Sequence, residues 1–264
     1  MTNIVGIGLD LAWSARNNTG IAALRWDGQC ASLIEARNVG SDDDIINAVK
    51  QLIGANQPVV VAIDAPLTVP NLEGRRPGDA EVHRVFGRFH AGAYPCNRRL
   101  LATHHGEVRG EVIARRLAHE LNIQHRATID PRQPTRQAFE AFPHPAMITL
   151  FGLDRTLKYK AKAGRSLPAR LTAFREYQRL IREKLGKGEP KLEIDEKLVH
   201  LLEERHLIAG GLTTLKRYED RLDAILCAYI SLYYWYWGLQ RCRIFGNEEE
   251  GYIIAPVDDR TREP

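Results

Sequence analysis

The stretch RYEDRLDAILCAY, residues 217–229, decides how the chain is organised. Asp220 and Asp223 stand three positions apart, so on a helix their carboxylates share one face. Apolar residues surround them on more than one side, which is typical of a helix that is mostly buried. Two carboxylates at the edge of such a helix are costly unless a cation lies between them, and a divalent metal ion would meet that need. The alternative is that the adjacent Arg217 and Arg221 pair with both acids.

Two apolar runs near the start of the chain each end in an aspartate. Residues 3–10, NIVGIGLD, predict a buried strand ending in Asp10, and residues 59–64, VVVAID, predict another ending in Asp64. Between them, an Asp-Gly turn at 27–28 and its flanking runs predict a meander of three antiparallel strands, followed by a crossover helix. The two aspartates would then meet at the carboxyl ends of neighbouring central strands, where open α/β sheets build their sites. For each aspartate alone, capping a turn is an equally good explanation.

Composition predicts an ordinary globular protein. The 264 residues are 44% hydrophobic and 27% charged, and we expect a single domain over residues 1–264. No apolar run is long enough for a membrane span, and the chain opens into a strand without a signal peptide, so we expect a cytoplasmic protein. The four cysteines show no CxxC spacing, which argues against a zinc knuckle and a disulfide framework.

Residues 71–137 form an arginine-rich segment, which we interpret as a helical insertion beside the active edge of the sheet. Between residues 75 and 136 there are 12 arginines, no lysine and 6 acids. Arginine forks match phosphate geometry, so this surplus favours a polyanionic partner, although an arginine-rich solvated surface explains it equally well. Arg75 and Arg76 are close enough in sequence to Asp64 to line the same cleft.

Two later segments add candidate site residues. Residues 137–145, QAFEAFPHP, predict a strand interrupted by prolines, which suits an edge or a bend. Within it, Glu140 is either a further metal ligand or a polar residue on an open face. Residues 157–160, LKYK, place Lys158 either beside the cleft or in a solvated turn. The remaining pattern predicts helices over 77–86, 107–122, 167–185 and 194–205, a last helix from Leu215, and a closing hairpin of residues 241–245 and 252–255.

Five motifs, taken in order, make the chain resemble the domain of unknown function 429 family, whose members are identified as predicted RNase H-like nucleases. The motifs are GLDLAW (8–13), IDAPL (63–67), FEAFP (139–143), YEDRLDA (218–224) and GYIIAP (251–256). The resemblance implies an α/β fold of the ribonuclease H-like type. Such a fold has a mixed five-stranded sheet in the order 3-2-1-4-5, flanked by helices, which agrees with the meander and crossover; here the helical insertion would follow the fourth strand.

The resemblance also implies a chemistry. Enzymes of this type bind two divalent ions through acids on the first strand, the fourth strand and the last helix, and hydrolyse phosphodiester bonds of DNA or RNA. The aspartate pair on the last helix is most similar to that of RuvC-type Holliday-junction resolvases. Oxygen ligands suit Mg2+ or Mn2+. The residues at the matching positions are Asp10, Asp64, Asp220 and Asp223, with Glu140 as a further ligand and Arg75, Arg76 and Lys158 on non-reacting phosphates.

Two other functional classes remain open at this point. A non-catalytic member would use the same scaffold to bind nucleic acid or a protein. A phosphotransferase of the actin-like or sugar-kinase type shares the sheet topology, but it needs two such domains and glycine-rich phosphate loops, which this sequence does not contain. The sequence carries no aromatic platform or known DNA-binding motif that would name the nucleic acid.

Overall fold

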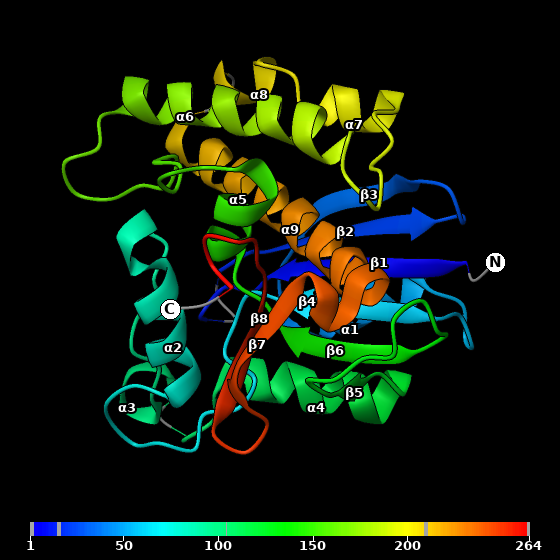
Figure 1. The fold of residues 1–264 in the computed structure, drawn as a ribbon, viewed down its shortest axis with the longest axis vertical. Coiled ribbons are helices and arrows are strands. Elements are labelled where there is room, and N and C mark those ends of the chain that lie inside the picture. The colour runs from blue at the N-terminus through cyan, green and yellow to red at the C-terminus, as the bar shows by residue number, and fades with distance from the viewer. Residues whose placement is uncertain (1–2, 15–16, 104, 209–210, 263–264) are drawn as a thin grey trace.

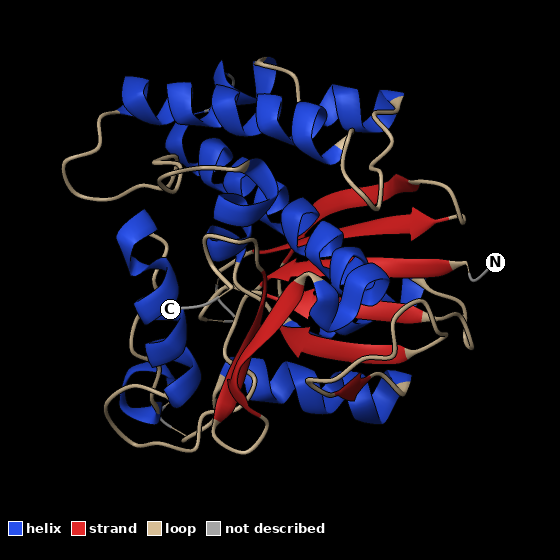
Figure 2. Ribbon diagram, in the orientation of Figure 1, coloured by secondary structure: helices blue, strands red, loops and turns tan. Residues whose placement is uncertain are grey.

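The centre of the molecule is a mixed six-stranded sheet in the order β3-β2-β1-β4-β6-β5 (Figures 1 and 2). The computed structural model describes residues 3–14, 17–103, 105–208 and 211–262. The strands are β1 (Ile4–Asp10), β2 (Thr19–Trp26), β3 (Ala31–Val39), β4 (Val59–Ile63), β5 (Gln124–His125) and β6 (Arg136–Glu140). The first three are antiparallel, and β4 runs parallel to β1 after the crossover helix α1 (Asp42–Leu52). The predicted meander and crossover are therefore confirmed.

The far side of the sheet differs from the prediction of five strands. The two-residue strand β5 pairs in parallel with β6, which adds a sixth strand and makes β6 an interior one. The prolines after β6 had suggested an edge or a bend. Instead, Pro143 begins helix α5 (Pro143–Phe151). The first helical turn tolerates proline because the N–H it lacks has no partner within the helix there.

The two faces of the sheet carry separate hydrophobic layers. Val5 and Ile7 of β1 pack with α1 and with α4 (Arg109–Leu121) on one face. On the other face lies the long helix α9 (Gly211–Trp237), which crosses the sheet and contacts β1 at Gly8. This alternation follows from the two-residue period of a strand.

An outer layer of helices covers α9 (Figure 1). It consists of α6 (Leu167–Leu180), which continues as a π-helical turn (Ile181–Leu185), α7 (Glu196–Leu201) and α8 (Arg205–Ile208). Buried rings of Tyr159 and Tyr177 fill the space between this layer and α9. The predicted helices are present here, but α7 is shorter than predicted and α9 starts one turn earlier than Leu215.

The chain closes in a hairpin that packs against the segment following β4. Its strands are β7 (Cys242–Asn247) and β8 (Gly251–Pro256), and the segment contributes α2 (Pro77–Phe86), a 3-10 turn (Gly87–Phe89) and α3 (Arg98–Leu101). Phe86, Phe245 and Ile253 belong to one buried cluster between α2 and the hairpin. The sequence prediction of both elements is confirmed.

No helix within the described ranges is long and apolar enough to cross a membrane. The four cysteines, all of which the structure describes, are unpaired.

Candidate active site

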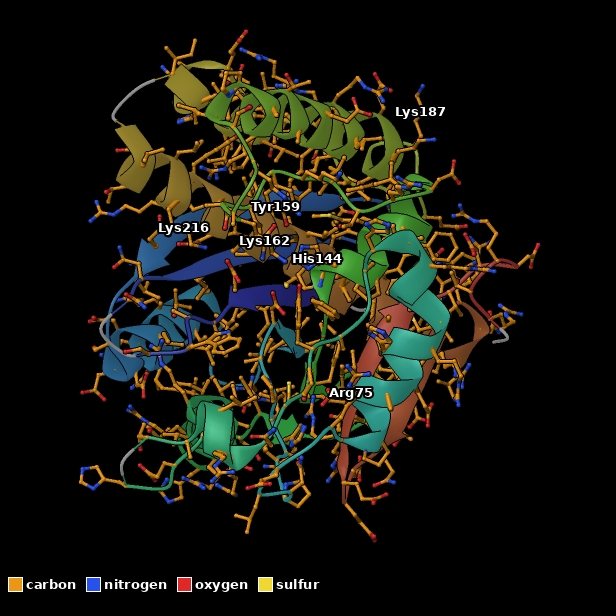
Figure 3. The ribbon with its side chains drawn as sticks, turned by 90° about the vertical axis from the view of Figure 1, so that its left-hand side faces the viewer. Arg75, His144, Tyr159, Lys162, Lys187 and Lys216 are labelled. Atoms are coloured by element: carbon orange, nitrogen blue, oxygen red, sulfur yellow. The ribbon has the colours of Figure 1, made fainter. Side chains whose placement is uncertain are left out.

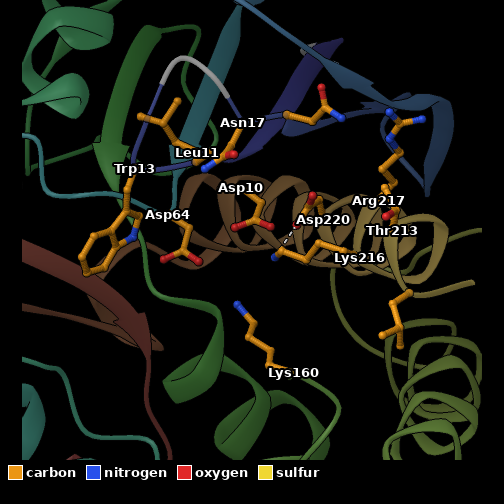
Figure 4. Close-up of a pocket in the computed structure, with 13 residues that line it drawn as sticks. Asp10, Leu11, Trp13, Asn17, Asp64, Lys160, Thr213, Lys216, Arg217 and Asp220 are labelled. Atoms are coloured by element: carbon orange, nitrogen blue, oxygen red, sulfur yellow. Dashed lines mark ion pairs between the residues drawn. The ribbon is translucent and has the colours of Figure 1, made fainter. Parts of the chain in front are cut away.

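A cavity of about 670 Å³ opens at the carboxyl ends of β1 and β4. Asp10, Asp64 and Asp220 line it together with Lys160 and Lys216. Figure 4 shows these side chains pointing into a common space. Three of the four aspartates predicted from the sequence therefore meet in one cavity, although they come from three different elements.

The parallel pairing of β1 with β4 brings the first two aspartates together. Leu9 is in register with Ile63, and the N–H of Asp64 donates to the carbonyl of Leu9 at 2.8 Å. Asp10 and Asp64 directly follow Leu9 and Ile63 in the sequence. They therefore lie side by side at the edge of the sheet where the two parallel strands end.

Helix α9 delivers the third aspartate because it packs unusually close to the sheet. A Cβ atom at Gly20 would lie 2.0 Å from the carbonyl oxygen of Asp220, and one at Gly8 would lie 2.0 Å from that of Ala224. Only residues without a side chain allow this approach. As a result, the carboxyl groups of Asp220 and Asp10 line the same cavity.

Asp223, one turn further along α9, lies behind the cavity wall and is fully buried. The hydroxyl groups of Tyr159 and Tyr177 donate to its Oδ1 atom at 2.7 and 3.2 Å. Its Oδ2 atom is 2.8 Å from Nζ of Lys160. Both oxygens of Asp223 are thus engaged within the protein, and one of their partners is a lysine that lines the cavity.

Two lysines lie among the aspartates. Lys160 pairs with Asp223, and Nζ of Lys216 is 2.7 Å from Oδ1 of Asp220. Burial lowers the pKa of each lysine, but the neighbouring carboxylates outweigh burial and raise both pKa values above the usual one. Both ammonium groups therefore stay charged at neutral pH.

The carboxyl groups of the cavity hold their protons more tightly than free aspartate does. Burial raises the pKa of Asp10 well above its ordinary value and that of Asp64 to about 7. Lys160 opposes the rise in both cases, while neighbouring carboxylates add to it. Burial also raises the pKa of Asp220. An additional cation would lower these pKa values and favour the ionised forms.

Glu140 lies outside this cavity, at the end of β6. Arg76 donates to its two oxygens at 2.9 and 2.6 Å, and the N–H of Leu67 donates at 2.9 Å. Arg76 is only 1% exposed and also pairs with Asp79 at 2.7 Å. The structure therefore assigns Glu140 and Arg76 to a buried ion-pair network, in place of the predicted metal ligand and phosphate contact.

The other two predicted phosphate contacts also lie away from the aspartates. Arg75 is exposed just before α2 (Figure 3). Lys158 is exposed and lines a second cavity, of about 290 Å³. Neither side chain lines the cavity of the three aspartates.

Part of the arginine surplus acts within the fold. Arg109, which is 7% exposed, donates to Asp42 at 2.8 Å and to the carbonyl oxygens of Ala12 and Ser14 at 2.6 and 2.9 Å. These contacts fasten the chain that follows β1 to α1 and α4. The surplus is therefore not entirely a surface that faces a polyanion.

Lys160, Lys216 and Trp13 are among the cavity residues that sequence reasoning did not assign to the site. Lys216 stands four positions before Asp220, and the helical i,i+4 rule could have paired them. Lys158 and Lys160 both lie in an irregular loop. Such a loop has no periodic pattern, so the sequence does not indicate which of the two lysines faces the cavity. Trp13 ends the GLDLAW motif that also contains Asp10, but as a 75% exposed apolar residue it was not assigned to the site.

A family model described as "Protein of unknown function (DUF429)" matches residues 8–250. No curated protein and no solved structure matches the chain.

Proposed function

The chain belongs to the DUF429 family, and we propose that it is a divalent-metal-dependent nuclease that hydrolyses phosphodiester bonds of DNA or RNA. The observation that carries this proposal is the meeting of Asp10, Asp64 and Asp220 in one cavity at the carboxyl ends of β1 and β4. Three carboxylates from two strands and a helix have no structural reason to converge on open space, since burial and mutual repulsion disfavour their charged forms.

The sheet supports a ribonuclease H-like interpretation of the fold. Its first four strands follow the order 3-2-1-4, with β1 to β3 antiparallel and β4 parallel to β1. β6 takes the place of a fifth strand next to β4, and β5 extends that edge. In this interpretation α9 is the helix that carries the last acidic residues.

The charges in the cavity are suited to a divalent ion. Within the described chain, no three His, Cys, Asp or Glu side chains already stand close enough to hold a metal. However, Asp10, Asp64 and Asp220 offer carboxylate oxygens, the ligands that Mg2+ and Mn2+ prefer. Burial and the neighbouring carboxylates raise the pKa values of these groups, and a cation bound among them would favour their ionised forms.

We propose that Asp10, Asp64 and Asp220 would hold the divalent ions of a two-metal-ion mechanism. When bound, these ions would polarise a phosphate group and activate a water molecule. Asp223 would act through Lys160, whose ammonium group it holds beside the carboxylates at 2.8 Å.

The cationic side chains supply the contacts that an anionic substrate needs. Lys160 and Lys216 keep their charge at neutral pH, so they would stabilise phosphate oxygens and would not take up a proton. Arg217 and the exposed ring of Trp13 lie on the same cavity. A cation and an aromatic ring beside the acids are the contacts expected for a phosphate and a base of a nucleic acid.

Calorimetric titration of Mn2+ and Mg2+ into the wild type and Asp10→Asn tests the proposal. We expect the substitution to weaken metal binding at least about tenfold and to abolish cleavage of nucleic acid, because it removes a charged ligand. Asp154→Asn is the matched control, since the Asp154 side chain is 99% exposed and does not line the cavity. Urea unfolding should show that Asp10→Asn keeps the stability of the metal-free protein.

Each protein is then incubated with single-stranded, duplex, hybrid and branched nucleic acids. Metal binding and cleavage that disappear together in Asp10→Asn, but persist in Asp154→Asn, support the nuclease. Nucleic-acid binding without metal binding or cleavage would instead make the chain a non-catalytic binding module. A fold that collapses in Asp10→Asn would identify the aspartate as a structural cap.

A further inference from the structure

A second cavity, of about 290 Å³, differs in its charged lining residues from the cavity of the three aspartates, which is called the acidic cavity below. Lys158, Lys162 and Arg165 line this basic cavity, and within the described chain no acidic residue does. All three cations belong to residues 156–165, between α5 and α6. The same segment sends Lys160 into the acidic cavity, so one stretch of chain contributes cations to both cavities.

A series of side-chain contacts connects the basic cavity with Asp223. His144 stacks on Tyr159 with 6.3 Å between ring centroids, and the hydroxyl of Tyr159 donates to Asp223 at 2.7 Å. Burial, followed by the charge of Lys160, lowers the pKa of His144 to about 3, so its ring is neutral at physiological pH. In the view of Figure 3, His144, Tyr159 and Lys162 are labelled near one another. His144, which lines the basic cavity, is thus linked through Tyr159 to an aspartate of α9.

An exposed aromatic side chain stands on the open side of the basic cavity. Tyr94 is 68% exposed, and its hydroxyl accepts a hydrogen bond from Nζ of Lys162 at 2.9 Å. The same ammonium group lies 5.1 Å from the centre of the ring. A stacking surface with a cation at its side is the arrangement that proteins use for one base and one phosphate of a single strand.

We propose that the basic cavity holds one nucleotide of a single-stranded nucleic acid, with its phosphate on the three cations and its base against Tyr94. Arginine supplies a planar fork and lysine a compact charge for phosphate oxygens. The volume is near the lower limit of about 300 Å³ for small-ligand sites, which suits a single nucleotide. A duplex keeps its bases stacked and has none free for Tyr94. The inference rests on the proposed function, because this nucleotide would adjoin the bond held in the acidic cavity.

Fluorescence anisotropy with a fluorescein-labelled single strand, used as DNA and as RNA, tests the proposal. All proteins carry Asp10→Asn and are measured with EDTA, so that no cleavage occurs. We expect Tyr94→Ala to weaken binding about tenfold, through the loss of stacking. Lys158→Met should weaken it about fivefold and reduce the slope of log Kd against log salt by about 0.7, the value for one phosphate contact on a single strand.

Lys187→Met is the matched control, because Lys187 is also an exposed lysine and lies apart from this cavity (Figure 3). Its Kd should equal that of the parent protein. Unchanged Kd values for both Tyr94→Ala and Lys158→Met would overturn the proposal, as would tighter binding of a duplex of the same sequence or no binding of either strand. If the wild type cleaves nucleic acid but the cavity variants bind normally, only this inference fails. If the cavity variants lose binding but the wild type cleaves no nucleic acid, only the proposed nuclease activity is contradicted.

Discussion

Lys160 occupies the space among the aspartates where a positive charge is most needed. Its partner Asp223 has no exposed surface, and the ion pair between them measures 2.8 Å. A buried carboxylate that loses its cation either remains unpaired or takes up a proton, and both outcomes cost free energy. The lysine therefore has a structural role in addition to any contact it makes with substrate.

Lys160→Met should lower the free energy of unfolding of the metal-free protein by about 2–4 kcal/mol, below the upper limit for a broken buried pair because Lys160 is partly exposed. Urea unfolding at neutral pH measures this. In Lys160→Met combined with Asp223→Asn the loss should be smaller, since no charge is left unpaired. Lys187→Met is the control, with a change within about 0.5 kcal/mol, because Lys187 is an exposed lysine. Equal losses in both single variants would contradict the role given to Asp223.

The aspartates of the cavity could be predicted because each follows a simple local pattern. Asp10 and Asp64 end buried strands, and Asp220 sits on one face of an apolar helix. Glu140 ends a buried strand just as Asp64 does, and the two strands are neighbours. It is nevertheless held by Arg76, which is 64 positions away in the chain. Nothing local in the sequence reveals a contact between such distant residues. The strand pattern alone therefore includes Glu140 among the acids of the cavity, where the structure does not place it.

At the scale of elements, the position of α9 on the sheet sets the geometry of the site. Gly8 lies under the helix with no room for a side chain, since its Cβ would be 2.0 Å from the carbonyl oxygen of Ala224 and 2.2 Å from the nitrogen of Ala228. Both are backbone atoms, so neither can rotate away. The helix would have to move off β1, and Asp220 would move with it.

Gly8→Ala should therefore destabilise the protein by about 1–3 kcal/mol or more, as overpacking of a core does. It should also weaken Mn2+ binding, although no ligand is changed. Urea unfolding and calorimetry measure the two effects. Gly54→Ala is the control, because a Cβ there would have its nearest neighbour at 3.7 Å and Gly54 is far from α9. If Gly8→Ala kept full stability, the close packing of helix on strand would not be what positions Asp220.

Elements with strong periodicity were predictable, and the others were not. The meander, α1, β4 and α2 each have a clear pattern of apolar residues or a turn signal. Strand β5 has two residues, which is too short for any alternation to show. Helix α5 was missed because its prolines resemble a break in the sequence, although Pro143 only marks the first turn of a helix.

At the scale of the whole molecule, one buried arginine connects the segment after β4 to the sheet. Arg76 joins Asp79 of α2 to Glu140 of β6, and it also donates to the carbonyl oxygen of Thr68 at 3.0 Å. Burial raises the pKa of Glu140, and Arg76 opposes that rise. The network lets two carboxylates stay buried at the junction of α2, the sheet and the closing hairpin.

Arg76→Met should destabilise the whole protein by about 3–5 kcal/mol, since it leaves two buried carboxylates without their cation. Arg75→Met is a matched control at the neighbouring position, where the side chain is exposed and the change should stay within about 0.5 kcal/mol. Thermal or urea unfolding of both variants gives the comparison. A similar stability for the two would show that the segment is fastened mainly by the apolar contacts of α2 with the hairpin.

The same three side chains restrict how this sequence can drift over evolutionary time. Arg76 forms ion pairs with both Asp79 and Glu140, and all three side chains are buried. A substitution at one position therefore leaves a buried charge without its partner, which costs free energy of folding. Relatives should therefore either keep all three or replace them together by uncharged residues of similar volume. These three positions should therefore covary in an alignment of relatives, whereas the aspartates of the cavity should stay unchanged. Relatives that have replaced the ion-pair network would then still keep the proposed active site.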